Sequence, residues 1–317
     1  MALEGSKTMR SGKIVVSAAA ALLLAAAWMP LAAQQGQGQA VITVLPHNKE
    51  AAPANVTDQD LAVHVNGKLA KVTGWTPTAD STLELVVLID GSARTSLGRE
   101  MSEIEQFVRA LPPNVKTAIA YMDQGRADFV APFSADHALV LRNLHLPGGM
   151  PGTDASPYFC LSYLAKHWPS QDGAARREVI MITDGVDRYN LRYDPNDPYL
   201  QAAIKDAARA HLVVYSIYWA DQGRIDTTDY ENNAGQNLLQ QLSEGTGGKA
   251  YWIGSGNPVT FQPYFNELLR RFQNQYELGV TAPLRGKAEL ETMKLKLSAP
   301  GAEVDAPNEV YITPGQP

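Results

Sequence analysis

The sequence lacks the features that mark disulfide-rich, zinc-binding and nucleic-acid-binding proteins. Its 317 residues include one cysteine, Cys160, so no intramolecular disulfide can form, and no Cys/His cluster has zinc-ligand spacing. Cys160 has apolar neighbours, and free cysteines of this kind are usually buried, so we expect an inert core thiol. Lysine and arginine are scattered and the formal net charge is -6, which excludes the basic stripe that phosphate binding needs. We therefore expect no nucleic-acid partner.

The motifs of common hydrolases and nucleotide-using enzymes are also missing. The chain has no Gly-x-Ser-x-Gly elbow, no His-Glu-x-x-His and no phosphate-binding loop, and its six histidines are dispersed. We therefore expect no enzyme activity. Metal-assisted hydrolysis by paired acids is the less favoured alternative.

The N-terminus has the pattern of a secretory signal peptide. Three basic residues precede residues 14–27, which are continuously apolar or small, and further small residues follow Pro30. We predict a signal peptide over residues 1–33 and an exported protein, periplasmic or extracellular. An uncleaved anchor is the alternative, because residues 14–33 approach the roughly 20 residues that span a bilayer. Only in that case would a membrane be a partner.

Four segments follow the predicted signal peptide. Residues 34–39 contain only Gln and Gly and predict a flexible linker. Residues 40–80 form an N-terminal β segment, in which Asn66-Gly67 predicts a tight hairpin turn between residues 61–65 and 68–72. Residues 81–275 are the central domain, and residues 276–317 are a β tail. Because neither flank alone buries a stable core, we predict that they pair in a small β module.

The central domain alternates buried strands with amphipathic helices. Residues 83–89 and 179–183 are apolar runs followed by an aspartate, a pattern typical of strands buried on both faces. Residues 115–122 and 127–133 are joined by a tight connection and predict an antiparallel pair. We predict an α/β fold: a doubly wound, mainly parallel sheet with one antiparallel edge strand, accompanied by the small β module of the flanks.

Two of these strands end at an acid, one at Asp90 and the other at Asp184. Both acids are expected at the edge of the sheet where ligands bind in such folds. Taken alone, Asp-Gly-Ser after a strand is an ordinary turn or helix N-cap, and Thr-Asp-Gly is equally common. The two motifs occur together, in this order and at this separation, and the predicted antiparallel pair lies between them. This combination favours a functional site.

The stretch Leu88-Ile89-Asp90-Gly91-Ser92 resembles the first segment of the metal-ion-dependent adhesion site of von Willebrand factor type A (vWA) domains. Residues 182–185 resemble the second acidic segment of that site, and residues 152–154 resemble its threonine loop. The resemblance implies a vWA, Rossmann-like fold, with Mg²⁺ or Mn²⁺ held by Asp90, Ser92, Thr153 and Asp184. Such hard oxygen ligands suit Mg²⁺, which keeps waters that an acidic group of a partner can replace.

Arg94 departs from the Asp-x-Ser-x-Ser pattern of that family, because a second serine is expected at its position. A guanidinium is always protonated and only donates hydrogen bonds, so it cannot be a metal ligand. If Arg94 points into the site, its charge takes the place of the cation by pairing with Asp90 or Asp184. If it points outward, Ser96 or a water completes the coordination. The sequence leaves both orientations of Arg94 open. It therefore also leaves open whether the site holds an ion.

Two long loops, residues 187–197 and 221–233, are expected at the same edge of the sheet. Their tyrosines and arginines are residue types enriched at protein-binding hot spots. We predict that they form a ligand-binding rim, while a pair of solvated mobile loops is the alternative. The predicted rim residues are Arg94, Asp187, Arg188, Tyr189, Tyr193 and Asp221.

The flanks extend the resemblance to nearly all of the mature chain. The hairpin of residues 60–75 and the strand of residues 276–280 resemble the flanks of the exported bacterial VWFA-related family typical of Acidobacteria. We therefore predict an extracytoplasmic, adhesion-type protein-binding module with a degenerate metal-ion-dependent adhesion site, whose ligand is an unidentified protein. A structural envelope component with an inert site is the alternative.

Overall fold

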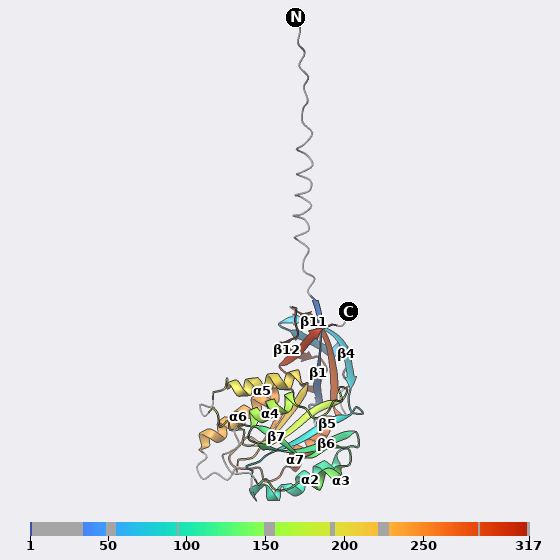
Figure 1. Ribbon diagram of the computed structural model, residues 1–317. Helices are drawn as coiled ribbons and strands as arrows, with labels where there is room; N and C mark the ends of the chain where they lie inside the picture. Colours follow the sequence, from blue (N-terminus) through green and yellow to red (C-terminus); the bar gives the residue numbers. More distant parts are fainter. Residues whose placement is uncertain are drawn as a thin grey trace.

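The computed structural model describes residues 1, 34–48, 55–93, 95–148, 156–190, 194–220, 228–284 and 286–315. These residues form two sheets, and Figure 1 shows the larger one above the sheet that carries the helices. The larger sheet has eight strands in the order β3-β2-β12-β14-β1-β11-β4, with β13 paired to β1. The smaller has six strands in the order β10-β9-β8-β5-β6-β7.

The six-stranded sheet is mixed. Its strand β5 is buried along its whole length, which explains the uninterrupted apolar run in the sequence. Four neighbouring pairs are parallel and β7 is an antiparallel edge strand, as the tight connection after β6 predicts. The strands are β5 (Leu83–Asp90), β6 (Val115–Asp123), β7 (Arg126–Ser134), β8 (Arg176–Thr183), β9 (Leu212–Tyr218) and β10 (Ala250–Tyr251).

Helices pack on both faces of this sheet. Alternate residues of β5 point to opposite faces, so Val87 and Ile89 join one apolar cluster and Val86 and Leu88 the other. The first cluster includes residues of α2 (Met101–Ala110), α3 (His137–Leu141) and α7 (Gln262–Gln273). The second includes residues of α4 (Pro157–Lys166), α5 (Pro198–Arg209) and α6 (Asp229–Gly245), with Cys160 buried as expected.

The eight-stranded sheet is antiparallel throughout. Its long strand β1 pairs with β11 from Gln34 opposite Leu284 to Thr43 opposite Gln275, and also with β13 and β14. Apolar side chains of both flanks, among them Ile42, Val63 and Leu278, form a third core cluster. The strands are β1 (Gln34–Pro46), β2 (Leu61–Val65), β3 (Lys68–Leu69), β4 (Lys71–Pro77), β11 (Gln275–Leu284), β12 (Glu289–Leu297), β13 (Ala302–Asp305) and β14 (Glu309–Pro314).

This architecture overturns the predicted fold class. A doubly wound, mainly parallel sheet with a small β module is wrong, because the antiparallel sheet of the flanks is the larger of the two and the helix-bearing sheet is mixed. The reason is that strands separated by more than two hundred residues, such as β1 and β11, pair along most of their length. Local sequence patterns indicate that the flanks pair but do not give the length or the register of such pairings.

Residues 34–39, predicted to be a flexible linker, instead begin β1. Their glycines have a packing role: a Cβ on Gly38 would lie 2.5 Å from the Ile312 side chain of β14. The Gln/Gly composition thus allows close approach between strands. The predicted signal peptide lies outside the described residues. Within them, no helix is both long and apolar enough to cross a membrane.

The predicted hairpin turn at Asn66-Gly67 is confirmed. Both residues have positive φ, 49° and 73°, and β2 pairs with β3 across them. The second arm is shorter than predicted, however. After Ala70 the chain leaves β2 and continues as β4, which pairs with β11 instead.

A buried polar network joins the two sheets. Arg176 of β8 donates to Glu178 Oε1 at 3.2 Å and also to the side chain of Gln275, the first residue of β11. Gln275 in turn donates to the Tyr215 hydroxyl at 3.0 Å. Burial raises the pKa of Glu178 to about 7, against the opposing charge of Arg176.

Candidate functional site

Two neighbouring parallel strands bring the predicted acids to one edge of the six-stranded sheet. Asp90 is the last residue of β5, and Asp184 follows the last residue of β8. The register pairs Ile89 with Ile182, so the two strands end side by side. Both aspartates are buried, which makes the identity of their partners decisive for the chemistry of the site.

The Asp90 carboxylate is held by neutral donors. Its Oδ1 accepts from the Ser92 amide at 3.0 Å and from the Ser92 hydroxyl at 2.7 Å. Its Oδ2 accepts from the Thr183 hydroxyl at 2.7 Å. The first pair of bonds is a local turn that Asp and Ser form readily, whereas the third crosses from β8 to β5.

The Asp184 carboxylate is held by a cation. Its Oδ1 accepts from the Val186 amide at 2.9 Å, and its Oδ2 pairs with Arg188 Nη2 at 2.8 Å. The Arg188 side chain is 15% exposed and that of Asp184 is 4% exposed, so the ion pair is largely removed from water. Burial raises the pKa of Asp184 to about 7, the Arg188 charge opposes this rise, and the charge of Asp90 adds to it.

Asp90, Ser92, Asp184 and Arg188 line one small cavity, together with Met122, Gly125, Ser156, Pro157 and Val186. The cavity volume is about 10 Å³, which is about the space that one water molecule needs. It can therefore take a single water or a bare ion. An organic molecule would have to bind outside it, on the surface above.

The loop that carries Asp184 is fixed by tight packing. Gly185 has φ 69°, and a Cβ on it would lie 2.6 Å from the Gly235 carbonyl oxygen of α6. The Gly185 carbonyl accepts from the Tyr158 hydroxyl of α4 at 2.6 Å. These constraints hold the second acid in place relative to the first. An Asp184-Gly185 pair therefore suits this position for steric reasons as well as chemical ones.

The oxygen ligands at this cavity fit a divalent cation in type but compete with an arginine. Two carboxylates and a hydroxyl are the hard donors that Mg²⁺ prefers. The Arg188 guanidinium, however, already pairs with Asp184 and supplies positive charge there. Within the described ranges, no group of three or more His, Cys, Asp or Glu side chains is arranged to hold a metal ion. An ion bound to Asp184 would have to replace the bond to Arg188.

Several predicted site residues fall outside the described residues. These are the predicted ligand Thr153 and the predicted rim residues Arg94, Tyr193 and Asp221, so the orientation of Arg94 stays open. The predicted role of Arg94 as an internal cation is filled among the described residues by Arg188.

The three described rim residues lie differently from one another. Asp187 is fully buried and its Oδ1 accepts from the Tyr189 amide at 2.8 Å, so it holds the loop and is not exposed at a rim. Arg188 turns inward to Asp184. Tyr189 is 61% exposed and packs edge-on against Phe159, at 4.8 Å between ring centroids. Only Tyr189 among these three has the exposure that a rim residue requires.

Sequence reasoning missed Thr183, which bonds to Asp90. A signal for it exists in the sequence. A threonine at the end of the apolar run of residues 179–183 needs a polar partner when it is buried. Because successive side chains of a strand point to opposite sides, such a partner can belong to the neighbouring strand. Thr183 is fully buried, and its partner is the acid of the neighbouring strand.

Neither a family model nor a curated protein matches this sequence. Solved structures with a similar chain path include the conserved hypothetical protein BatB from Bacteroides thetaiotaomicron, which is 16% identical with a TM-score of 0.43 over 60% of this chain and 96% of that chain. An aerotolerance-related membrane protein from Bacteroides fragilis is 17% identical with a TM-score of 0.42, over 59% of this chain and 98% of the other. The VWA domain of SpRpn10 is 8% identical with a TM-score of 0.38, over 59% and 95%. Because no family model matches, the predicted relation to the VWFA-related family stays a prediction.

Proposed function

We propose that this protein is an exported protein-binding module of the vWA type, which engages an acidic group of its partner at the carboxyl edge of the six-stranded sheet. The observation that carries the proposal is the convergence of Asp90, Ser92 and Asp184 on one cavity of ionic size. Two buried acids from neighbouring strands form an arrangement that needs a positive charge to be stable.

In this proposal Asp90, Ser92 and Asp184 hold a divalent cation, Mg²⁺ or Mn²⁺. When bound, the ion supplies an open coordination position for a carboxylate of the partner protein. Thr183 orients Asp90 through its hydroxyl, and the Val186 amide orients Asp184. Arg188 neutralises Asp184 when no ion is present, and it must move aside when the ion binds.

Tyr189 supports a protein as the ligand. It directly follows Arg188 in the chain, is largely exposed, and is backed by Phe159 of α4 and Tyr199 of α5. A rigidly supported exposed tyrosine offers apolar area and one hydroxyl at low cost in conformational entropy, which is why such residues anchor protein interfaces. A partner that binds above the cavity would also contact Tyr189, which lies beside the cavity.

One observation favours a second function, a structural envelope component with an inert site. The ion pair of Arg188 and Asp184 satisfies the more deeply buried acid without any metal. If that pair is permanent, the edge of the sheet has no cation to offer a ligand. The two functions differ in one measurable property, the affinity of the site for a divalent ion.

The deciding experiment is calorimetric titration of the exported protein, produced with its own N-terminal segment, with Mg²⁺ and with Mn²⁺. The proposal expects saturable binding of one ion, and loss of that binding in Asp184→Ala. Asp206→Ala is the matched control, because Asp206 is also a mostly buried acid in an ion pair, with Lys166 at 2.7 Å, but lies on α5 outside the cavity. Binding that survives in Asp184→Ala, or the absence of binding in the unmodified protein, would refute metal-dependent adhesion and leave the structural function.

A further inference from the structure

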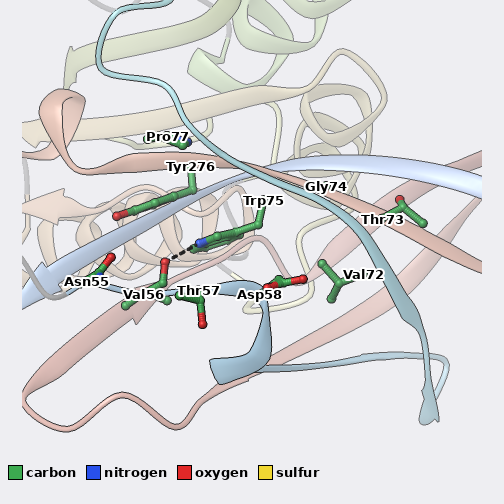
Figure 2. A pocket seen from close by; sticks show the side chains of 10 residues that line it. All are labelled: Asn55, Val56, Thr57, Asp58, Val72, Thr73, Gly74, Trp75, Pro77 and Tyr276. Atoms are coloured by element: carbon green, nitrogen blue, oxygen red, sulfur yellow. Dashed lines mark hydrogen bonds between the residues drawn. The ribbon is translucent and has the colours of Figure 1, made fainter.

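A second and much larger cleft lies at the edge strand of the eight-stranded sheet. Its volume is about 540 Å³, within the range of roughly 300–1,000 Å³ that small-molecule sites occupy. Figure 2 shows its walls, which come from β4, from the segment of residues 55–58 and from the start of β11. The lining residues are Asn55, Val56, Thr57, Asp58, Val72, Thr73, Gly74, Trp75, Pro77 and Tyr276.

The cleft contains a stacked aromatic pair, whose outer ring face is called the aromatic platform below. The rings of Trp75 and Tyr276 are stacked, with centroids 4.4 Å apart and planes inclined by only 4°. The Trp75 indole nitrogen donates to the Val56 carbonyl at 2.9 Å, which fixes the plane of the indole (Figure 2). Both side chains are partly exposed. The platform is therefore in place before any ligand arrives, so little conformational entropy is lost on binding.

A β-bulge places the side chains of Val72 and Trp75 on the same face of β4. Gly279 pairs with Gly74 while the next residue, Val280, pairs with Val72, so that Thr73 is the extra residue on β4. At a bulge the strict alternation of side chains is broken. Val72 and Trp75, although three positions apart, consequently both line the cleft, whereas the Thr73 hydroxyl lies beside Gly279 on the other side of the strand (Figure 2).

The same strand is poorly suited to binding an extended peptide. β4 is the terminal strand of the sheet order, but it carries Lys71 at its start, the bulge at Thr73 and Pro77 at its end. Charged residues, bulges and prolines are the devices by which edge strands avoid pairing with another chain. A compact ligand that contacts side chains fits β4 better than an added strand does.

The polar lining identifies the chemistry of that ligand. Asn55, Thr57 and Asp58 are exposed and offer an amide, a hydroxyl and a carboxylate, and the Thr57 hydroxyl already donates to Asp60 Oδ2 at 2.9 Å. None of the ten lining residues is Lys, Arg or His, so no cationic side chain of the lining complements the charge of a phosphate or a carboxylate. The site thus combines one flat apolar surface with several hydrogen-bonding groups and a single negative charge.

We propose that this cleft binds a neutral oligosaccharide, with one pyranose ring lying on the aromatic platform. The face of an aromatic ring is the negative part of its quadrupole and attracts the polarised C–H groups that one side of a pyranose presents. The sugar hydroxyls at the ring edge donate to Asp58 and exchange hydrogen bonds with Asn55. A cationic ligand fits less well, because two parallel rings present one face and do not surround a charge as an aromatic cage does.

The test is calorimetric titration of the exported protein with cellotetraose, maltotetraose and chitotetraose, each up to about 10 mM, since affinities of isolated sugar sites extend into the millimolar range. We expect saturable binding of at least one of the three, weakened about tenfold or more in Trp75→Leu and in Asp58→Asn. Trp252→Leu is the matched control and should bind normally. Trp252 also donates its indole N–H to a backbone carbonyl, that of Gly256 at 2.9 Å, but it lies after β10 in the other sheet.

Asp58→Asn keeps the test decisive if Trp75→Leu fails to fold, because Asp58 is exposed and its replacement preserves shape. The proposal is overturned if none of the three oligosaccharides binds, or if binding is unchanged in Asp58→Asn. It is equally overturned if tetramethylammonium binds the cleft and the oligosaccharides do not, since the platform would then serve a cation. None of these outcomes bears on the metal affinity of Asp184, so this test and that of the proposed function are independent.

Discussion

Arg188 follows Asp184 by four residues on the same loop. Its Nη2 donates to Asp184 Oδ2 at 2.8 Å. The pair is largely buried, so each charge depends on the other for stabilisation. A divalent ion at the cavity would use the same carboxylate. Arg188 and such an ion would therefore compete for Asp184, and any affinity of the site for metal would be the difference between two favourable interactions with this carboxylate.

Removing the internal cation should strengthen metal binding. In Arg188→Gln the Asp184 carboxylate loses its partner, and a dication no longer works against a fixed positive charge at close range. We expect the affinity for Mg²⁺, measured by calorimetric titration, to rise about tenfold or more. Arg209→Gln is the control, because Arg209 pairs with Asp206 in a comparable manner, at 3.1 Å, on α5. Equal affinities in the unmodified protein and in Arg188→Gln would show that Arg188 does not compete.

Local features of the fold could be predicted from the sequence, but the size of its larger sheet could not. The buried run of β5, the antiparallel pair of β6 and β7 and the Asn66-Gly67 turn all have short-range causes, and each is present. The pairing of β1 with β11 joins segments that are more than two hundred residues apart. The glycines of β1 admit the close approach of β14, and the same glycines suggest a flexible linker when the sequence is considered alone.

The candidate site also has features that the sequence predicts and features that it does not. Asp90, Ser92 and Asp184 could be identified because each follows directly from a strand and its turn. The inward direction of Arg188 could not, since it depends on how a long loop folds back onto the sheet. The cleft of Trp75 and Tyr276 was not predicted either. Its two aromatic residues are about two hundred positions apart and meet only through the pairing of β4 with β11.

The buried Glu178 predicts a dependence of stability on pH. Its pKa is about 7 in the folded protein and near 4.5 when unfolded, so between these values the folded state binds more protons. Stability therefore falls as pH rises from about 4.5 to about 7, and this group contributes up to about 3 kcal/mol to the fall. In Glu178→Gln that contribution is absent. We expect the free energy of unfolding of the variant, measured with urea, to rise relative to the unmodified protein as pH increases across this interval. A constant difference between the two proteins would contradict the shifted pKa.

Thr183 should act on the site through Asp90. Its hydroxyl donates to Asp90 Oδ2 at 2.7 Å, and both groups are buried. Thr183→Val keeps the shape of the side chain but leaves that carboxylate oxygen without its donor, which costs about 1–3 kcal/mol in the free energy of unfolding. Thr183→Ser retains the hydroxyl and is the matched control, expected to restore most of the loss. If the hydroxyl positions Asp90 for a cation, Mg²⁺ affinity should follow the same order, highest with threonine, intermediate with serine and lowest with valine. Full stability in Thr183→Val together with destabilisation in Thr183→Ser would assign the effect to packing of the methyl group, which valine keeps and serine lacks, and would remove Thr183 from the site.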